Sequence, residues 1–441
     1  MNKRLRITGS FMRLSTWSAG VSSVRGILAR LGLLVAMIPV FYATASAEDL
    51  KLQNLIDEAL QNNHEIIMLE ARMGAARFRI PQAKSLPDPM FMIGYQNDGV
   101  RNLYTFGSDM AEDSQWMFTV SQMFPFPGKR DLKGEMALKD SEGLVALRDA
   151  LRLKTALRIK ELYYDLFLAY KDIDLLKEKQ SLFERVEEAA LARYSSGTGT
   201  QQEVLMAQTE KYMLLEKEEM RRQKIQSLEA MMNATVGREV NSPLGRPGDP
   251  GRTEFSLTMD ELIRTAYENS PEIAAKKKMA EAAGAKLEMA KKEFYPDFTI
   301  NATYALKGRQ FPDMWSMSAA VNIPLFYKTK QRPAVQEAEQ SLTEVVHDIE
   351  AVKIMTASVI RDNYSMFRSS ERLMDIYKNG LIPKTYQDFE LALSGYVTGK
   401  IEAITVISRL KSLIDFELLY WGQFAEREKA IARLHASTGG K

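Results

Sequence analysis

The residues that could carry catalysis or bind a metal are few and scattered. The chain of 441 residues has no cysteine and three histidines, His64, His347 and His435. Two histidines that bind one metal on a helix recur at positions i and i+4, which brings both rings to one face. These three lie far apart, and we find no phosphate-binding glycine loop and no nucleophile motif. The sequence therefore predicts no catalytic, cofactor-binding or metal-binding residue, and we expect no enzyme activity.

Methionine is the other residue type with ligand chemistry, and the chain has 24 of them. In an extended strand, Met90 and Met92 share a face with Gly94 and Gln96, because side chains alternate from one side to the other. Thioethers bind soft metal ions, but methionine also fills gaps between packed elements. We favour the packing role, and a metal contact at Met90 and Met92 stays open.

One long stretch organises the rest of the chain. Between Asp131 and Tyr194 there is no proline, and no glycine follows Gly143. Read as one helix, this stretch would be about 96 Å long at 1.5 Å per residue, so it must pack lengthwise against other long helices. Its apolar residues recur at helical spacing and form one seam: Leu162, Leu166, Ala169, Ile173, Leu176, Phe183 and Ala190.

The same order of elements is predicted twice, which indicates an internal duplication. The first repeat, residues 48–240, is predicted to contain a helix over 52–83, strands over about 89–96 and 115–124, a long helix over about 130–194 and a return helix over about 200–236. Residues 241–256 form a linker. The second repeat, residues 257–436, is predicted to contain an opening helix, strands over about 298–306 and 314–323, a long helix over about 333–396 and a return helix over about 400–436.

Two helix reversals and one proline mark these long helices. Each reversal has the form Tyr-x-x-Gly, and glycine can adopt the positive φ that ends a helix and turns the chain. Pro383 lacks an N–H group, so we expect a kink in the second long helix. The reversals contain Tyr194, Gly197, Thr198, Tyr396, Gly399 and Lys400.

The predicted strands alternate between apolar and polar residues. Segments of about 9–10 residues with one apolar face and aromatic ends are typical of transmembrane β-barrels; the alternative is a soluble sheet with one face on a core. Four strands cannot close a barrel, so two chains would give eight strands and three would give twelve. The long helices favour twelve strands. Side chains fill an eight-stranded barrel, and a helical tube would then continue a closed pore. The residues predicted to face lipid are Phe118, Val120, Ile300 and Val321.

Residues 1–47 resemble a cleaved export signal. Six basic residues and no acid precede Glu48, and an apolar run over 27–42 leads to the small residues Ala45-Ser46-Ala47. A membrane anchor is the alternative, but Arg30 leaves about 12 apolar residues where a spanning helix needs about 20. Without this segment, 53 basic and 57 acidic residues remain, a formal charge of −4. This balance gives no support to a nucleic-acid partner.

Together, the duplication, the paired reversals and the strands resemble the outer-membrane efflux factors, the TolC family, over essentially all of the mature chain. The segment from Val120 to Arg130 contains Gln122-Met-Phe-Pro-Phe-Pro-Gly-Lys129. It is similar to the Gln-x-x-Pro-Phe-Pro-Gly-Lys pattern of the branch that serves heavy-metal pumps of the resistance–nodulation–division (RND) type.

The resemblance implies a homotrimer with a twelve-stranded β-barrel in the outer membrane and a twelve-helix tunnel that extends into the periplasm. The protein would be a passive exit duct, with heavy-metal cations as expected substrates; drug efflux, type I protein secretion and a non-conducting periplasmic coiled-coil scaffold are the alternatives. The reversal residues would meet a periplasmic adaptor, or membrane fusion protein, that connects to an inner-membrane RND pump. Glu203 and Glu402, which follow the two reversals, would constrict the passage and attract cations, or else be ordinary first-turn acids.

Overall fold

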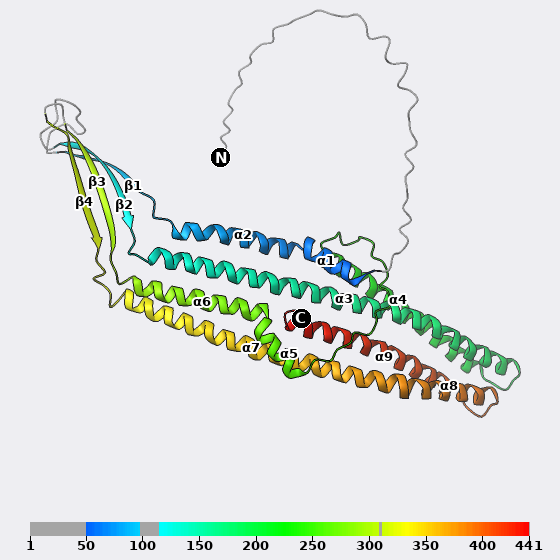
Figure 1. Cartoon of the computed structure of the whole chain (residues 1–441). Helices are drawn as coiled ribbons and strands as arrows, with labels where there is room; N and C mark the ends of the chain where they lie inside the picture. Colours follow the sequence, from blue (N-terminus) through cyan, green and yellow to red (C-terminus); the bar gives the residue numbers. More distant parts are fainter. Residues whose placement is uncertain (1–49, 98–113, 308–310, 441) are drawn as a thin grey trace, which may run out of the picture. The chain divides into compact units, whose positions relative to one another are not determined.

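The computed structural model describes residues 50–97, 114–307 and 311–440 (Figure 1). The predicted export signal, residues 1–47, lies outside the described residues. The first repeat contains α1 (Leu52–Asn62), α2 (His64–Lys84), β1 (Met90–Gln96), β2 (Gln115–Phe124), α3 (Lys129–Ser195) and α4 (Gln201–Val236). The second contains α5 (Met259–Asn269), α6 (Pro271–Lys292), β3 (Asp297–Lys307), β4 (Met314–Asn322), α7 (Gln331–Asp375), a π-helix (Ile376–Leu381), α8 (Ile382–Val397) and α9 (Ala403–Ser437). The predicted fold class, long helical hairpins with four strands, is confirmed.

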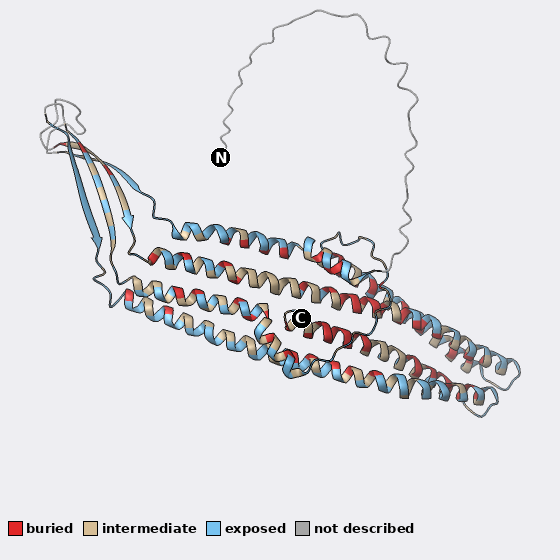
Figure 2. Ribbon diagram, viewed as in Figure 1, coloured by how far each residue is buried: buried red, intermediate tan, exposed pale blue. Residues whose placement is uncertain are grey.

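The long helix α3 is the element against which most of the others pack. Its 67 residues contact α2 and α6 near the strands, and α4 and α9 towards the hairpin ends (Figure 1). All seven residues of the predicted seam are buried, and burial in α3 is concentrated in its second half (Figure 2). The long helix is therefore stable because its apolar face is covered lengthwise, as its spacing predicted. No helix in the described part of the chain has a stretch long and apolar enough to cross a membrane.

Two predicted helices are interrupted. The helix predicted over 52–83 breaks at Asn63, whose extended backbone ends α1 and whose side chain accepts hydrogen bonds from the N–H groups of Glu65 (2.9 Å) and Ile66 (3.3 Å). This is an N-cap that starts α2. The second long helix has its interruption just before Pro383, where Ile376–Leu381 form a π-helix. A π-turn accommodates the missing N–H group and the bulk of the proline ring.

The four strands form one antiparallel sheet in the order β1-β2-β3-β4. Residues that pair directly across strands point to the same side, so the register defines the two faces. Phe118 pairs with Ile93 and Tyr304, and Val120 pairs with Phe91 and Ala302. Ile300 and Val321 belong to this same face through the pairing of β3 with β4. The structure thus places the four residues predicted to face lipid on one apolar face.

The strand and helix neighbours follow the same order. Strands β1, β2, β3 and β4 are adjacent in that order, and so are the helices α2, α3, α6 and α7 that adjoin them in the chain (Figure 1). The two repeats therefore meet along β2 and β3 in the sheet and along α3 and α6 in the helical layer.

A buried lysine joins the two repeats where strands become helices. The Lys129 side chain is 3% exposed, and its Nζ donates to Asp297 Oδ1 (2.9 Å), the Tyr295 carbonyl (3.1 Å) and Glu293 Oε2 (3.3 Å). Asp297 Oδ1 also accepts the backbone N–H of Phe126 at 2.8 Å, and the Phe126 ring stacks on Tyr295. The Pro-Phe-Pro-Gly-Lys segment is thus a joint that fixes the start of α3 against the start of β3.

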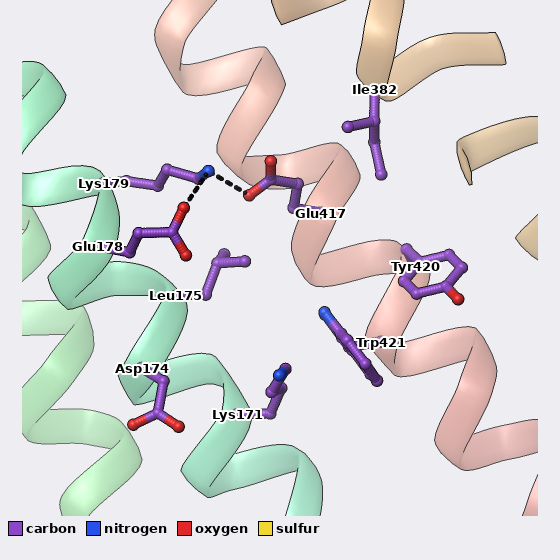
Figure 3. A pocket seen from close by; sticks show the side chains of 9 residues that line it. All are labelled: Lys171, Asp174, Leu175, Glu178, Lys179, Ile382, Glu417, Tyr420 and Trp421. Atoms are coloured by element: carbon purple, nitrogen blue, oxygen red, sulfur yellow. Dashed lines mark hydrogen bonds and ion pairs between the residues drawn. The ribbon is translucent and has the colours of Figure 1, made fainter. Parts of the chain in front are cut away.

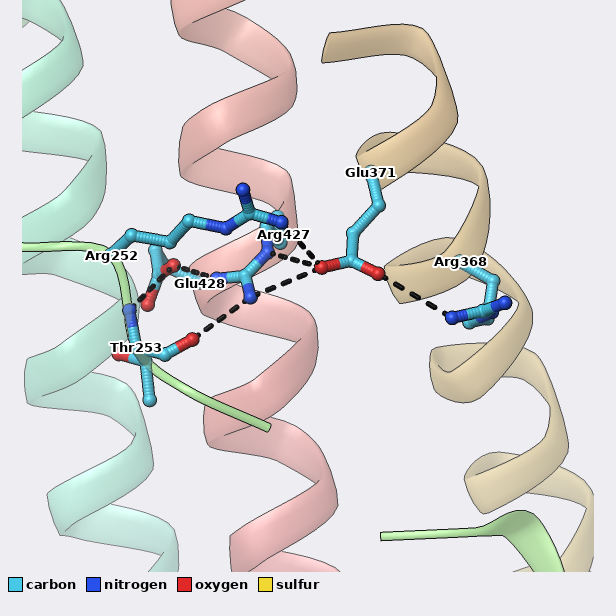
Figure 4. Close-up of polar contacts among 6 residues, drawn as sticks. All are labelled: Arg252, Thr253, Arg368, Glu371, Arg427 and Glu428. Atoms are coloured by element: carbon cyan, nitrogen blue, oxygen red, sulfur yellow. Dashed lines mark hydrogen bonds and ion pairs between the residues drawn. The ribbon is translucent and has the colours of Figure 1, made fainter. Parts of the chain in front are cut away.

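A second buried cation holds the linker between the repeats (Figure 4). Arg427 is fully buried in α9, and its Nη2 donates to the Thr253 carbonyl at 2.8 Å. Its guanidinium also pairs with Glu371 at 3.3 Å and with Glu428, which accepts the Thr253 N–H. Because the N–H and C=O groups of Thr253 bind Glu428 and Arg427, and Arg427 also pairs with Glu371, the linker is tied to α7 and α9.

Replacing Lys129 by methionine should lower the free energy of unfolding by about 3 kcal/mol, because the poorly exposed carboxylate of Asp297 would lose its countercharge. Lys276→Met is the matched control: Lys276 pairs with Asp348 at 2.7 Å across α6 and α7, but both side chains reach solvent, so the loss should stay below about 1 kcal/mol. Thermal melting of the detergent-solubilised protein, followed by circular dichroism, measures both. Equal shifts would show that the joint is no more stabilising than a surface ion pair.

Candidate functional site

The two helix reversals lie at the ends of the α3–α4 and α8–α9 hairpins (Figure 1). Gly197 has φ +72° and Gly399 has φ +76°, the left-handed region that ends a helix at glycine. The N–H of Thr198 returns to the Arg193 carbonyl at 2.9 Å, and the N–H of Lys400 returns to the Gly395 carbonyl at 2.8 Å. The backbones of the two turns are therefore equivalent, as the duplicated sequence predicted.

The tyrosines of the two reversals have different environments. Tyr194 is 49% exposed, whereas Tyr396 is fully buried and its hydroxyl donates to Glu203 Oε2 at 2.8 Å. Burial, reinforced by the hydrogen bond to the Glu203 carboxylate and its charge, raises the pKa of Tyr396, so the phenol keeps its proton at neutral pH. The sequence grouped Tyr396 with surface residues of the reversals, and the structure corrects this: the side chain belongs to the core between the two hairpins.

Arg193 completes the connection between the hairpins. Its guanidinium lies 4.6 Å from the centre of the Tyr396 ring, and it donates to the carbonyls of Tyr396 (2.5 Å) and Thr198 (3.0 Å). Arg193 was not among the residues predicted to act at the reversals. The signal was an asymmetry, because the second repeat has Gly395 where the first has Arg193. Arg193 reaches the second hairpin through the Tyr396 ring and carbonyl, whereas the space beside Gly395 is taken by the Ile401 side chain of its own turn.

The two acids that follow the reversals are not equivalent either. Glu203 is half-buried in the first turn of α4 and its carboxylate accepts from Tyr396. Glu402 is exposed at the N-cap of α9. Of the pair, Glu402 is the acid whose carboxylate is presented to solvent. Five of the six reversal residues are exposed with it, and these are Tyr194, Gly197, Thr198, Gly399 and Lys400.

An apolar core and a shallow groove lie behind the reversals. The core joins α3, α4, α8 and α9 through Phe183, Val204, Phe389 and Leu410, among others. The groove, of about 230 Å³, is lined by residues of α4 and α9. Two of its apolar side chains, Leu205 and Ile404, are exposed in the single chain. Exposed apolar residues beside a polar turn are the usual composition of a protein contact surface.

A charged pocket of about 330 Å³ lies between α3 and α9, beside the end of the π-helix (Figure 3). Lys179 pairs with Glu417 at 2.9 Å and Glu178 at 3.0 Å. Burial raises the pKa of the Glu417 carboxyl, and the Lys179 cation opposes this. Lys171 lies over the Trp421 ring at 4.4 Å. These charged groups partner one another across the helix interface, so the pocket belongs to the packing of the hairpins.

Metal-binding clusters do not occur among the described residues. No three histidine, cysteine, aspartate or glutamate side chains of these residues are grouped so that they could hold a metal ion. The three histidines lie on different helices, α2, α7 and α9. The ring of His435 packs edge-on against Phe255.

Tyr396→Phe should loosen the contact between the hairpin ends. The hydroxyl donates to a charged carboxylate, a hydrogen bond that contributes about 1.5–3 kcal/mol, so amide hydrogen exchange near Gly399 should become about tenfold faster or more. Tyr194→Phe is the matched control, because it removes the hydroxyl of the equivalent but exposed residue. Exchange followed by mass spectrometry compares the two. Unchanged exchange in Tyr396→Phe would contradict a stabilising role for the Tyr396–Glu203 bond.

Comparison with known proteins agrees with this fold. The sequence model of the family described as "Outer membrane efflux protein" matches residues 55–237 and 262–437. The cobalt-zinc-cadmium resistance protein CzcC of Cupriavidus metallidurans is 20% identical over 417 residues, which cover 92% of this chain and 93% of CzcC.

Solved structures have the same fold. The crystal structure of CusC, described in terms of folding and transmembrane channel formation, has a TM-score of 0.76 at 15% identity and covers 88% of this chain and 92% of CusC. The outer membrane protein VceC of Vibrio cholerae has a TM-score of 0.74 at 19% identity, covering 88% of this chain and 96% of VceC. The predicted family and the predicted outer-membrane location are confirmed: the chain belongs to the outer membrane efflux protein family.

Proposed function

We propose that the protein is the outer-membrane channel of a tripartite efflux system, a passive exit duct fed by an inner-membrane RND pump through a periplasmic adaptor. The observation that carries the proposal is the sheet. Its apolar face continues across all four strands, and in the described residues β1 and β4 each pair on one side only. A sheet of this kind is complete only when its edges pair with other strands.

Closure by three copies gives the sheet its environment. Twelve strands make a barrel whose apolar face, with Phe118, Val120, Ile300 and Val321, contacts lipid, while the polar face lines a passage. The helices adjoin the strands in the same order, so three copies also surround a helical tunnel that extends the passage into the periplasm. A coiled-coil scaffold would account for the helices and would leave the alternation of the strands without a purpose.

The hairpin ends are the parts that meet the adaptor and close the passage. The exposed residues of the reversals and the apolar groove beside Leu205 and Ile404 form the docking surface. Glu402, repeated three times around the axis, gives the constriction its negative charge. Glu203 and Tyr396 do not face the passage in this proposal. Their hydrogen bond holds the two hairpins of one chain together. Opening then requires the adaptor to separate contacts of this kind.

Heavy-metal cations are the substrates that the comparison with CzcC supports. That relative is described as a cobalt-zinc-cadmium resistance protein, and its match covers 92% of this chain. The negative formal charge of the mature chain and the exposed Glu402 are compatible with the passage of cations.

Single-channel recording in a planar bilayer tests the proposal. The purified full-length protein in potassium nitrate should form channels, and Glu402→Lys should lower the preference for K⁺ over nitrate, because it reverses the charge at the constriction. Glu337→Lys is the matched control, since Glu337 is an exposed acid of α7 far along the chain from the reversals. A protein that inserts but conducts no ions would refute the exit duct. Equal selectivity in both variants would remove Glu402 from the constriction.

A further inference from the structure

The methionines of the sheet are distributed against their hydrophobicity. A thioether side chain is apolar, so lipid contact would favour methionine on the apolar face. The strands contain six methionines, and only Met317 lies on the apolar face, where it pairs with Ala302. The other five lie on the polar face among serine, threonine and asparagine residues: Met90, Met92, Met117, Met123 and Met314.

Gap filling does not explain the three most exposed of these side chains. A methionine that fills a gap is buried by its neighbours, whereas Met90, Met92 and Met314 are 66%, 56% and 53% exposed. They project from the sheet on the side of Thr119, with which Met92 pairs directly. Exposed thioethers on a hydroxyl-bearing surface are available to a ligand.

The register arranges three of them as successive steps along the sheet. Met90 pairs with Ser121, Met92 with Thr119, and Met117 with Gly94, each two residues further along. Same-face positions two residues apart are separated by about 6.6–6.8 Å. Gly94 has no side chain, and the terminal methyl of Met117 lies 3.5 Å from the position that a Cβ at Gly94 would take. Met117 therefore leans over β1 and continues the column of Met90 and Met92.

We propose that this column, with Met90, Met92 and Met117, is a binding ladder for soft monovalent cations of the Ag⁺ and Cu⁺ class. The proposal rests on the proposed function, because the polar face lines a passage only when the sheet closes into a barrel. Neutral thioethers are soft ligands that select such ions over hard cations. Single thioethers repeated at intervals bind weakly at several places, which lets an ion enter and also leave. Three copies of the chain place three ladders around the passage.

Silver block of the potassium current tests the ladder in the full-length reconstituted channel. The solutions contain nitrate salts, because chloride precipitates silver. Ag⁺ should reduce the K⁺ current of the unsubstituted protein. The triple variant Met90→Leu, Met92→Leu, Met117→Leu should need about tenfold more Ag⁺ for half-block, a difference of about 1.4 kcal/mol. Leucine conserves the volume and removes only the sulfur.

Two controls keep the ladder and the channel separable. Met317→Leu removes the methionine of the apolar face and should leave half-block unchanged, and Zn²⁺ should act equally on all variants. The K⁺ current without Ag⁺ reports whether each variant folds and inserts. If the triple variant does not insert, Met92→Leu alone is measured, and it should raise the Ag⁺ concentration for half-block by a smaller factor. Equal half-block in the unsubstituted and Met92→Leu or triple variants would overturn the ladder while the channel stands. Absence of any K⁺ current in the unsubstituted protein would overturn the proposed function, and the ladder with it.

Discussion

The open edges of the four-stranded sheet are the constraint on which the rest of the structure depends. In the described residues β1 and β4 each have one paired side, so their outer N–H and C=O groups have no strand partner within the sheet. Each unsatisfied backbone group in hydrocarbon costs several kcal/mol. The apolar face that suits the sheet to lipid is therefore compatible with lipid only when other strands cover both edges. Identical chains arranged around an axis provide those strands.

The helices extend this constraint away from the membrane. Each strand adjoins a helix, and the helices keep the order of the strands. The Lys129 joint fixes this correspondence, because it ties the first turn of α3 to the residues that begin β3. The 67 residues of α3 run unbroken from the joint to the first reversal. Closure of the strands around an axis therefore also arranges the hairpin ends around that axis.

Local periodicity made much of this fold predictable. The 3.6-residue seam of α3 and the two-residue alternation of the strands are properties of neighbouring positions, and both faces lie where the pattern placed them. The break at Asn63 was not predicted, because the residues on both sides of it have a helical pattern. The Asn63 side chain caps the next helix instead of letting one helix continue. The partner of Lys129 was out of reach of the sequence, since Asp297 is 168 positions away.

The duplication misled at the hairpin ends. Repeated sequence suggested that Tyr194 and Tyr396, and likewise Glu203 and Glu402, have the same role in each repeat. The two hairpins pack on each other, however, and one tyrosine fills the contact while the other faces solvent. The sheet methionines were also only partly predictable. Alternation placed Met90 and Met92 on one face, but the position of Met117 beside them depends on the pairing of β1 with β2.

Disulfide cross-linking between the edge strands tests the central claim most directly. The natural chain has no cysteine, so Ile93→Cys or Phe91→Cys in β1 can be combined with Met317→Cys or Ala319→Cys in β4 without background. Val120→Cys with Ala302→Cys, which pair directly within one chain, controls for oxidation. After oxidation in the membrane, we expect at least one edge combination to give covalent dimers and trimers and nothing larger. Cross-links confined to a single chain, or a series that stops at dimers or continues beyond trimers, would contradict a barrel shared by three copies.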